Sequence, residues 1–148
     1  MYLDSAIIVK LLVREEDSAW FNANIAGHEL WTSELALAEV RSAILIKERS
    51  GLISVAERKR ALARFDLMHA EKLLHMHPLN SQVVERAAGL LTSCHPEVGL
   101  RSLDALHLAT ALLHLRGPLC TTDNKLRAAA QRIGVSCFPE NLGDIVKN

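Results

Sequence analysis

The sequence has no excess of charge of either sign. Its 17 Lys and Arg residues are balanced by 17 Asp and Glu residues, so the formal net charge of the 148 residues is zero. Proteins that are held to nucleic acid by their overall charge are strongly basic, and this balance argues against that mode of binding. A local basic patch remains compatible with the composition.

Cysteine is scarce, and long apolar runs are missing. The three cysteines, Cys94, Cys120 and Cys137, are odd in number and form no C-x-x-C pair, which indicates reduced, buried thiols in a cytoplasmic protein. The first residues, "MYLDS", lack a basic segment and reach an acid at once, so we expect no signal peptide. No apolar run has membrane-spanning length, and we expect no membrane partner.

Several motifs of phosphate-handling proteins are absent as well. Neither G-x-x-x-x-G-K-[ST] nor G-x-G-x-x-G occurs, which disfavours the common nucleotide-binding loops. The segment "DSA", residues 4–6, lacks the second Asp of the D-x-D motif of haloacid-dehalogenase-like phosphatases. A response-regulator receiver needs paired acids after its first strand, and Asp4 has no acidic neighbour.

The residues that are present describe one α/β domain, which we expect to span residues 1–148. Hydrophobic residues make up 49% of the chain and charged residues 23%, an ordinary globular balance. Strands are predicted over residues 1–3, 28–33, 75–79, 118–122 and 135–139. Helices are predicted over residues 5–16, 18–27, 34–51, 55–74, 81–94, 101–116 and 124–134. This alternation predicts a mostly parallel sheet.

The segment "RSLDALHLATALLHLRG", residues 101–117, is apolar almost all round when it is read as a helix. Such a helix belongs in the middle of a domain. Asp104 is nevertheless the only formally charged side chain between Arg101 and Arg116. An acid in the first turn gains roughly 0.3–1 kcal/mol from the helix dipole. The helix dipole explains why an acid is tolerated at position 104, but it does not explain why an acid is present on a helix that is otherwise so apolar.

A second carboxylate, Glu39, is predicted on the buried face of the helix over residues 34–51. Its helical neighbours are mostly small or apolar: Leu35, Ala36, Ser42, Ala43 and Ile46. A carboxylate there costs several kcal/mol unless it is paired or bound to a metal. The alternative to a metal is an ion pair with an arginine such as Arg41 or Arg101.

Two further acids, Asp4 and Asp123, each end a predicted strand and precede a helix. Taken alone, each is a favoured N-cap. In a parallel sheet, however, the strand ends lie at the same edge as the start of the helix with Asp104 and the early turn with Glu39. Crowded carboxylates repel one another, so a divalent cation is their natural counter-charge. Oxygen ligands favour Mg²⁺ or Mn²⁺ over Zn²⁺.

These acids occur in motifs that resemble the PIN-domain ribonucleases, specifically the VapC-like toxins of bacterial type II toxin–antitoxin pairs. The matching segments are "YLDSA" with Asp4, "ALAEVRSAI" with Glu39, "SLDALHLATA" with Asp104 and "TTDNKL" with Asp123. Each motif alone is weak, but the ordered set with family-like intervals is specific. The resemblance covers essentially the whole chain, as far as "VSCFP".

The resemblance implies a PIN-like three-layer α/β sandwich whose central sheet is flanked by helices. It also implies Mg²⁺ or Mn²⁺ held by the acids, and metal-dependent hydrolysis of phosphodiester bonds in structured RNA such as tRNA or rRNA. Homodimers and inhibition by a cognate, VapB-like antitoxin are implied as well. Asp4, Asp104 and Asp123 are then the expected metal ligands, and Glu39 either binds a second ion or orients the attacking water.

Two hydroxyl side chains, Ser5 and Thr121, are candidates for a supporting role, because they can hold a carboxylate or a ligated water. Simple capping and turn formation explain them equally well. For the whole chain, the alternative is a degenerate PIN module that binds RNA or protein without cleavage. Its mark would be lost acids, and all four are present.

The histidines and the basic run have plainer interpretations. His75 and His77 share a strand face, and His107 and His114 share a helix face, but neither pair has partners at zinc spacing. We therefore expect structural or surface histidines. The run "ERKRALAR" is expected to form a solvated helix face rather than a contact for phosphate or antitoxin: Arg58, Lys59, Arg60 and Arg64.

Overall fold

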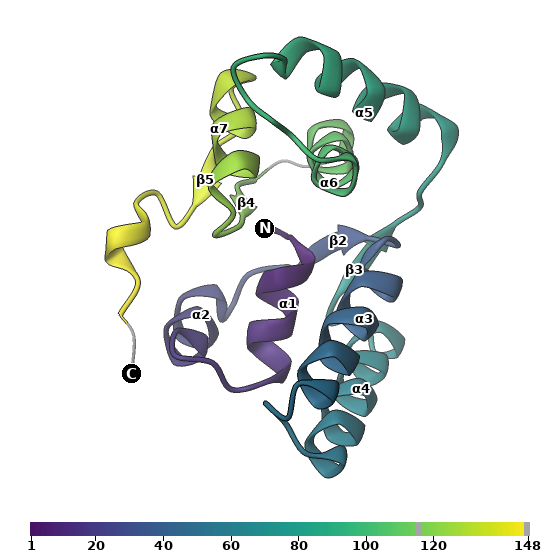
Figure 1. Ribbon diagram of the computed structural model, residues 1–148, viewed down its shortest axis with the longest axis vertical. Helices are drawn as coiled ribbons and strands as arrows, with labels where there is room; N and C mark the ends of the chain where they lie inside the picture. Colours follow the sequence, from purple (N-terminus) through teal and green to yellow (C-terminus); the bar gives the residue numbers. More distant parts are fainter. Residues whose placement is uncertain (115–116, 147–148) are drawn as a thin grey trace.

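The computed structural model of the protein describes residues 1–114 and 117–146, and a parallel sheet runs through its middle (Figure 1). Within the described residues, five strands pair in the order β3-β2-β1-β4-β5, and all four pairings are parallel. The strands are β1 (Tyr2–Leu3), β2 (Trp31–Ser33), β3 (His75–His77), β4 (Leu119–Cys120) and β5 (Cys137–Phe138). Each lies within a predicted strand, which confirms the α/β class.

The helices match the predicted segments: α5 has the predicted bounds, and the others are shorter. They are α1 (Ser5–Leu12), α2 (Ser18–Ile25), α3 (Ala36–Arg49), α4 (Val55–Ala70), α5 (Ser81–Cys94), α6 (Ser102–His114) and α7 (Asn124–Arg132), followed by a 3₁₀ turn over Leu142–Asp144. The predicted end of α6 at residues 115–116 lies outside the described residues. α1 stops early because Val13 is extended, and Lys10 then pairs with Glu15 and Asp17 across the turn.

Local signals fix the hairpin of α3 and α4. Gly51, just past α3, has a φ of +72°, a conformation that favours glycine and that ends the helix. Ser54 then opens α4 with a capping box. Its hydroxyl accepts from the Glu57 backbone N–H at 3.2 Å, and the Glu57 carboxylate accepts from the Ser54 backbone N–H at 2.7 Å.

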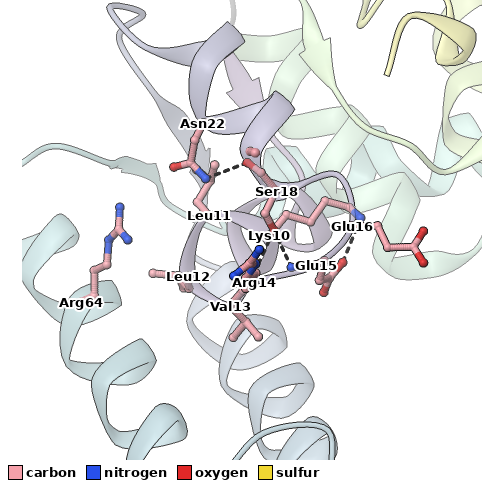
Figure 2. A pocket seen from close by; sticks show the side chains of 11 residues that line it. Lys10, Leu11, Leu12, Val13, Arg14, Glu15, Glu16, Ser18, Asn22 and Arg64 are labelled. Atoms are coloured by element: carbon pink, nitrogen blue, oxygen red, sulfur yellow. Dashed lines mark hydrogen bonds and ion pairs between the residues drawn. The ribbon is translucent and has the colours of Figure 1, made fainter. Parts of the chain in front are cut away.

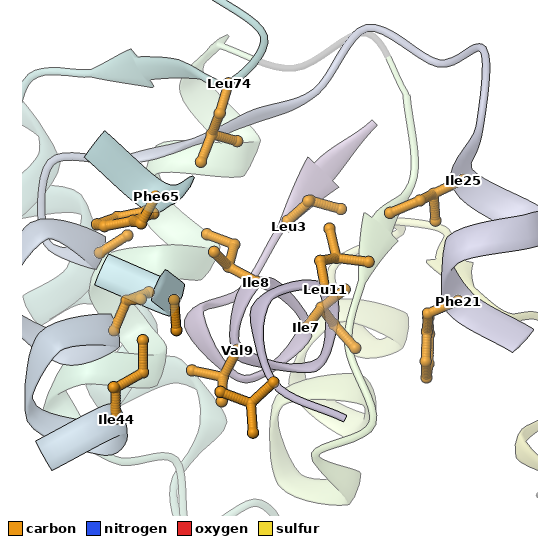
Figure 3. Close-up of a cluster of buried hydrophobic side chains, with 14 of the residues drawn as sticks. Leu3, Ile7, Ile8, Val9, Leu11, Phe21, Ile25, Ile44, Phe65 and Leu74 are labelled. Atoms are coloured by element: carbon orange, nitrogen blue, oxygen red, sulfur yellow. The ribbon is translucent and has the colours of Figure 1, made fainter. Parts of the chain in front are cut away.

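Helices cover both faces of the sheet, which gives the three layers (Figure 1). On one face, α1 to α4 pack over a core that includes Leu3, Ile7 and Phe65 (Figure 3). On the other face, α5, α6 and α7 pack over a second core that includes Tyr2 and Leu108. Successive β1 residues point to opposite faces and so belong to different cores. The dry helix α6 lies in the second core, between α5 and α7, as its composition predicted.

The strand order places a topological switch point between β1 and β4. β2 pairs with β1 on one side, and β4 pairs with β1 on the other. In open parallel sheets, ligands bind outside the carboxyl ends of the strands at such a point. α1 begins directly after β1, and α7 begins shortly after β4. The acids between these elements therefore lie at the position where the fold favours a ligand.

Two expectations from composition concern the cysteines and membrane spans. All three cysteines are free thiols, with Cys94 and Cys120 buried and Cys137 partly buried. Over residues 1–114 and 117–146, no helix is long and apolar enough to cross a membrane.

Candidate active site

Asp4 and Asp123 lie at the carboxyl ends of neighbouring strands, and each also caps a helix. Asp4 Oδ1 accepts a hydrogen bond from the Ile7 backbone N–H at 2.8 Å at the start of α1. Asp123 Oδ1 accepts from the backbone N–H groups of Lys125 and Leu126 at 2.8 and 2.9 Å at the start of α7. The capping interpretation and the shared-edge interpretation therefore both hold.

Thr121 joins these two acids. Its hydroxyl donates to Asp4 Oδ2 and accepts from the Asp123 backbone N–H at 3.1 Å. Burial raises the pKa of Asp4; the hydrogen bonds from Thr121 and Ile7 oppose this rise, and the nearby charge of Asp123 adds to it. Thr121 thus contacts a carboxylate directly, besides its contribution to the turn.

A buried arginine, Arg127, contacts this turn from its buried side, and it was not predicted as a site residue. Arg127 on α7 is 6% exposed, and its guanidinium donates to the backbone carbonyls of Thr121 at 3.1 Å and Glu140 at 2.7 Å. It therefore ties the turn after β4 to the segment after β5. Its position four residues after Asp123, on the buried face of α7, is the signal that could have found it.

Asp104 lies in the first turn of α6 and is half-buried. Its Oδ2 is a buried atom without a hydrogen-bond partner in the described part of the chain. Burial raises the pKa of Asp104, and the charges of Asp123 and Glu39 raise it further, while Arg101 and His107 lower it. These couplings bring Asp104 into one electrostatic group with the other acids.

Arg101 lies across two of these acids. Its guanidinium is 3.8 Å from Asp104 Oδ2 and 3.7 Å from Asp123 Oδ2. Both distances are too long for hydrogen bonds, so these are loose ion pairs. The arginine side chain is 68% exposed. Arg101 is therefore an exposed counter-charge that the protein itself supplies at this edge.

Glu39 has different partners from those predicted. Its Oε2 accepts from the Ser5 hydroxyl at 2.6 Å and from His107 Nε2 at 2.7 Å. The predicted alternative of an ion pair with Arg41 or Arg101 is wrong: Arg41 pairs with Asp66, and Arg101 lies on the two aspartates. Burial tends to raise the pKa of Glu39, but the hydrogen bonds from His107 and Ser5 outweigh it and lower the pKa.

His107 is the second site residue that sequence reasoning missed. It is 3% exposed, and its Nδ1 is 2.9 Å from the buried Tyr2 hydroxyl. Because Nε2 donates to Glu39, the Tyr2 hydroxyl donates to Nδ1 in the neutral ring. The expectation of a structural histidine understated its role, since it holds Glu39. The informative spacing is Asp104-x-x-His107, which puts both residues on one face of α6.

The chemistry of this group fits a hard divalent cation, although the side chains do not surround one. Within the described ranges, no three His, Cys, Asp or Glu side chains are arranged so that they could hold a metal ion. Each of these acids contacts another side chain instead. Thr121 contacts Asp4, and His107 contacts Glu39. Arg101 lies near the two other aspartates. The unpartnered Asp104 oxygen and the mutual repulsion of the acids fit a missing positive charge.

Three other histidines form a separate cluster. The rings of His75 and His77 stack on Trp31 at centroid distances of 4.4 and 4.7 Å, and His77 stacks on His114 at 4.3 Å. None of the four acids belongs to this stack. It has the structural or surface character that was expected of these residues.

The basic run of α4 is largely a solvated face, as predicted. Lys59, Arg60 and Arg64 are exposed. Arg58 is half-buried and forms an ion pair with Glu48 at 3.2 Å. The run is therefore no part of the acidic site.

A surface pocket of about 430 Å³ opens near that helix. Figure 2 shows it beside the end of α1, with Lys10, Arg14 and Arg64 among its lining side chains. The Lys10 ammonium is already paired with Glu15 at 3.0 Å and Asp17 at 2.9 Å. None of the four acids lines this pocket, so it is distinct from the site at the sheet edge.

Comparison with known proteins decides the family. A model of the PIN domain matches residues 1–132. The chain belongs to the PIN domain family. "Ribonuclease VapC46" of Mycobacterium tuberculosis (strain ATCC 25618 / H37Rv) is 40% identical over 139 residues, which cover 92% of this chain and 94% of that protein. The resemblance to VapC-like PIN proteins is therefore confirmed.

Two solved structures support the PIN fold. FitAcB from Neisseria gonorrhoeae superimposes with a TM-score of 0.68 at 19% identity, over 94% of this chain and 96% of that one. A toxin–antitoxin complex from Klebsiella pneumoniae gives 0.57 at 20% identity, over 86% and 89%. The PIN-like three-layer fold is thus confirmed.

Proposed function

We propose that this PIN-domain chain is a metal-dependent endoribonuclease, the toxin of a toxin–antitoxin pair, that hydrolyses phosphodiester bonds in structured RNA such as tRNA or rRNA. The main observation is the buried oxygen of Asp104, which has no hydrogen-bond partner among the described residues and lies near Asp123, whose charge also acts on Asp4, at the switch point of the sheet. The similarity to "Ribonuclease VapC46" supports the choice of RNA as substrate.

Asp4, Asp104 and Asp123 would hold Mg²⁺ or Mn²⁺. When bound, such a cation supplies a water of lowered pKa and neutralises charge on the phosphate. Thr121 contributes by fixing the Asp4 carboxylate through its hydroxyl, and Arg127 holds the Thr121 turn from the buried side. These contacts restrict the rotation of the ligands before any cation arrives.

We assign Glu39 the role of orienting the water that attacks the phosphodiester bond. His107 and Ser5 both donate to its Oε2 and keep it ionised, since they lower its pKa. An ionised carboxylate in a fixed position can orient a water and accept its proton. Hydrolysis then joins the water oxygen to phosphorus, breaks a P–O bond and returns a proton to the leaving oxygen.

The proposal includes partners. The VapC-like character of the chain supports a cognate, VapB-like antitoxin as its inhibitor, a homodimer as its assembly and the cytoplasm as its location. The most direct genetic test is the neighbouring gene, which we expect to encode a small DNA-binding antitoxin.

The biochemical test compares the purified wild type with Asp4→Asn. We expect the wild type to cleave structured RNA in Mg²⁺ or Mn²⁺ and to stop in EDTA, because the ligand set needs a hard cation. Mg²⁺ should also stabilise the wild type, by about 2.7 kcal/mol in the free energy of unfolding at about 100 times its Kd. The melting temperature of the wild type should therefore rise with Mg²⁺, and that of Asp4→Asn should rise less.

The alternatives give different results. RNA binding without cleavage in either metal would identify a degenerate PIN module. Equal cleavage by the wild type and Asp4→Asn would remove Asp4 from the site. Cleavage that persists in EDTA would exclude the metal.

A further inference from the structure

We propose that Arg101 and Lys125 bind a phosphate of the RNA backbone at the mouth of the acidic site. This inference rests on the proposed ribonuclease function. A neutral chain needs a local basic patch to hold RNA. Among the described residues, Arg101 lies on two of the candidate acids, and Lys125 follows Asp123 by two residues.

Arg101 has donor groups that the acids do not use. Its contacts to Asp104 and Asp123, at 3.8 and 3.7 Å, are longer than hydrogen bonds, and its side chain is 68% exposed. A planar guanidinium presents several donors that match phosphate oxygens in pairs. Arg101 can therefore bind a phosphate without giving up a hydrogen bond inside the protein.

Lys125 lies on the same edge. It is exposed and follows the cap Asp123 by two residues, with its own backbone N–H on the Asp123 carboxylate. Its ammonium also lies beside the backbone of Gly99, since a Cβ placed on Gly99 would be 4.0 Å from Lys125 Nζ. Gly99 precedes Arg101 by two residues, so the Lys125 ammonium lies beside the segment that carries Arg101.

Three other arginines already have close partners. Arg127 donates to two backbone carbonyls at 3.1 and 2.7 Å and is buried. Arg132 is 3.4 Å from Glu97, at the far end of α7. Arg41 pairs with Asp66 on the α3–α4 hairpin. Arg101 differs from these because, in the described part of the chain, its carboxylate partners are the acids that the proposed function assigns to a cation.

Arg101 can pair with the aspartates of the site or with a phosphate of the RNA, but not with both at the same time. Without a divalent cation, its guanidinium offsets the charge of Asp104 and Asp123. Once a divalent cation neutralises these aspartates, the attraction that holds Arg101 over them is lost. The phosphate brought by the RNA is then the anion within its reach.

The first experiment measures RNA binding in Mg²⁺ with a fluorescein-labelled tRNA transcript as the probe. It uses the Glu39→Gln background, which keeps all three aspartates, and adds Arg101→Ala, Lys125→Ala or Arg132→Ala. For Arg101→Ala and Lys125→Ala we expect the slope of log Kd against log [NaCl] to fall by about 1 each. Arg132→Ala is the matched control, because α7 carries it about 12 Å along the axis from residue 124, and its slope should not change.

The second experiment needs no RNA. Removal of the Arg101 charge should let Mg²⁺ stabilise the chain at an approximately fivefold lower concentration in thermal melts, because a unit charge about 4 Å away contributes about 1 kcal/mol in water. Arg101→Lys should restore both the salt slope and the Mg²⁺ midpoint. A merely structural role for Arg101 would not tighten Mg²⁺ binding.

The two proposals fail in distinguishable ways. If the wild type cleaves neither the tRNA transcript nor rRNA in Mg²⁺, the ribonuclease function is contradicted. If the wild type cleaves either RNA, but Arg101→Ala and Lys125→Ala keep the salt slope of Arg132→Ala, the phosphate contact is overturned.

Discussion

Asp104 and Glu39 are two carboxylates in the first turns of two helices, at the same edge of the sheet, and they have opposite surroundings. Asp104 has a buried oxygen without a hydrogen bond, and its pKa is raised by burial and by its acidic neighbours. Glu39 accepts hydrogen bonds from Ser5 and His107, which lower its pKa in spite of burial.

This difference divides the site into two functional halves. Around Asp104 the protein supplies too little positive charge, so that half is prepared for a cation from solution. Around Glu39 the protein supplies its own donors, so that half is complete before any cation binds. A residue that is left unsatisfied reduces the stability of the fold, whereas a residue that is paired adds to it.

The largest effect should come from Asp104→Asn. We expect it to lower RNA cleavage in Mg²⁺ by at least about 100-fold, more than the loss of a single outer-shell partner of a metal site. In EDTA its melting temperature should equal or exceed that of the wild type, because the amide removes like-charge repulsion. Cleavage assays and thermal melts of the same preparation check both results.

Asp66→Asn is the matched control for this change. Asp66 is exposed and pairs with Arg41 away from the site, so its variant should keep full cleavage. A large loss of stability in Asp104→Asn, with no effect of Mg²⁺ on the wild type, would mean that Asp104 serves the fold through the helix dipole.

The next effect concerns the completed half. His107→Ala should destabilise the fold by about 2–4 kcal/mol, because it opens a cavity in the second core and leaves Tyr2 and Glu39 without a partner. Denaturant unfolding in EDTA measures this loss. His107→Gln, which keeps a donor on the side of Glu39, should lose less. Equal losses for the two variants would show that the ring serves packing alone.

The two halves also differ in how far the sequence predicts them. Asp4 and Asp123 are predictable because strand ends and N-caps are local features, and a parallel sheet brings its strand ends to one edge. The partners of Glu39 are not predictable in this way. Ser5 and His107 lie 34 and 68 residues from it, and which donor reaches a buried carboxylate depends on how α3 and α6 pack.

Arg127 and Arg101 show the same limit at closer range. Arg101 was predicted as a possible partner of Glu39, whereas its guanidinium lies near Asp104 and Asp123 in the structure. Arg127 reads as one more cation of a polar helix. Only the return of the chain after β5, with the Glu140 carbonyl, explains why a charged side chain is buried there. Every residue has a backbone carbonyl, so the sequence does not indicate which residues supply such contacts.

The smallest effect is the pH dependence of stability, and it tests whether the pKa values of Glu39 and Asp104 are shifted in opposite directions. The pKa of Glu39 in the folded protein lies below its ordinary value of 4.5. Glu39 therefore stabilises the fold above pH 4.5, and this contribution is lost as the pH falls through the lowered pKa. Glu39→Gln should cost about 1–2 kcal/mol near neutral pH, and its deficit should vanish in acid. Denaturant midpoints in EDTA from about pH 3 to 7 measure it.

Asp104→Asn should show the opposite trend in the same measurements. The pKa of Asp104 is raised above its ordinary value of 3.8, so the ionised carboxylate costs stability, and the cost appears as the pH rises through the raised pKa. The variant should therefore gain on the wild type toward neutral pH, while Glu39→Gln falls behind it. Glu85→Gln, an exposed change on α5, should follow the wild type throughout. Parallel curves for Glu39→Gln and Asp104→Asn would mean that both carboxylates have the same surroundings, and the division of the site into two halves would be wrong.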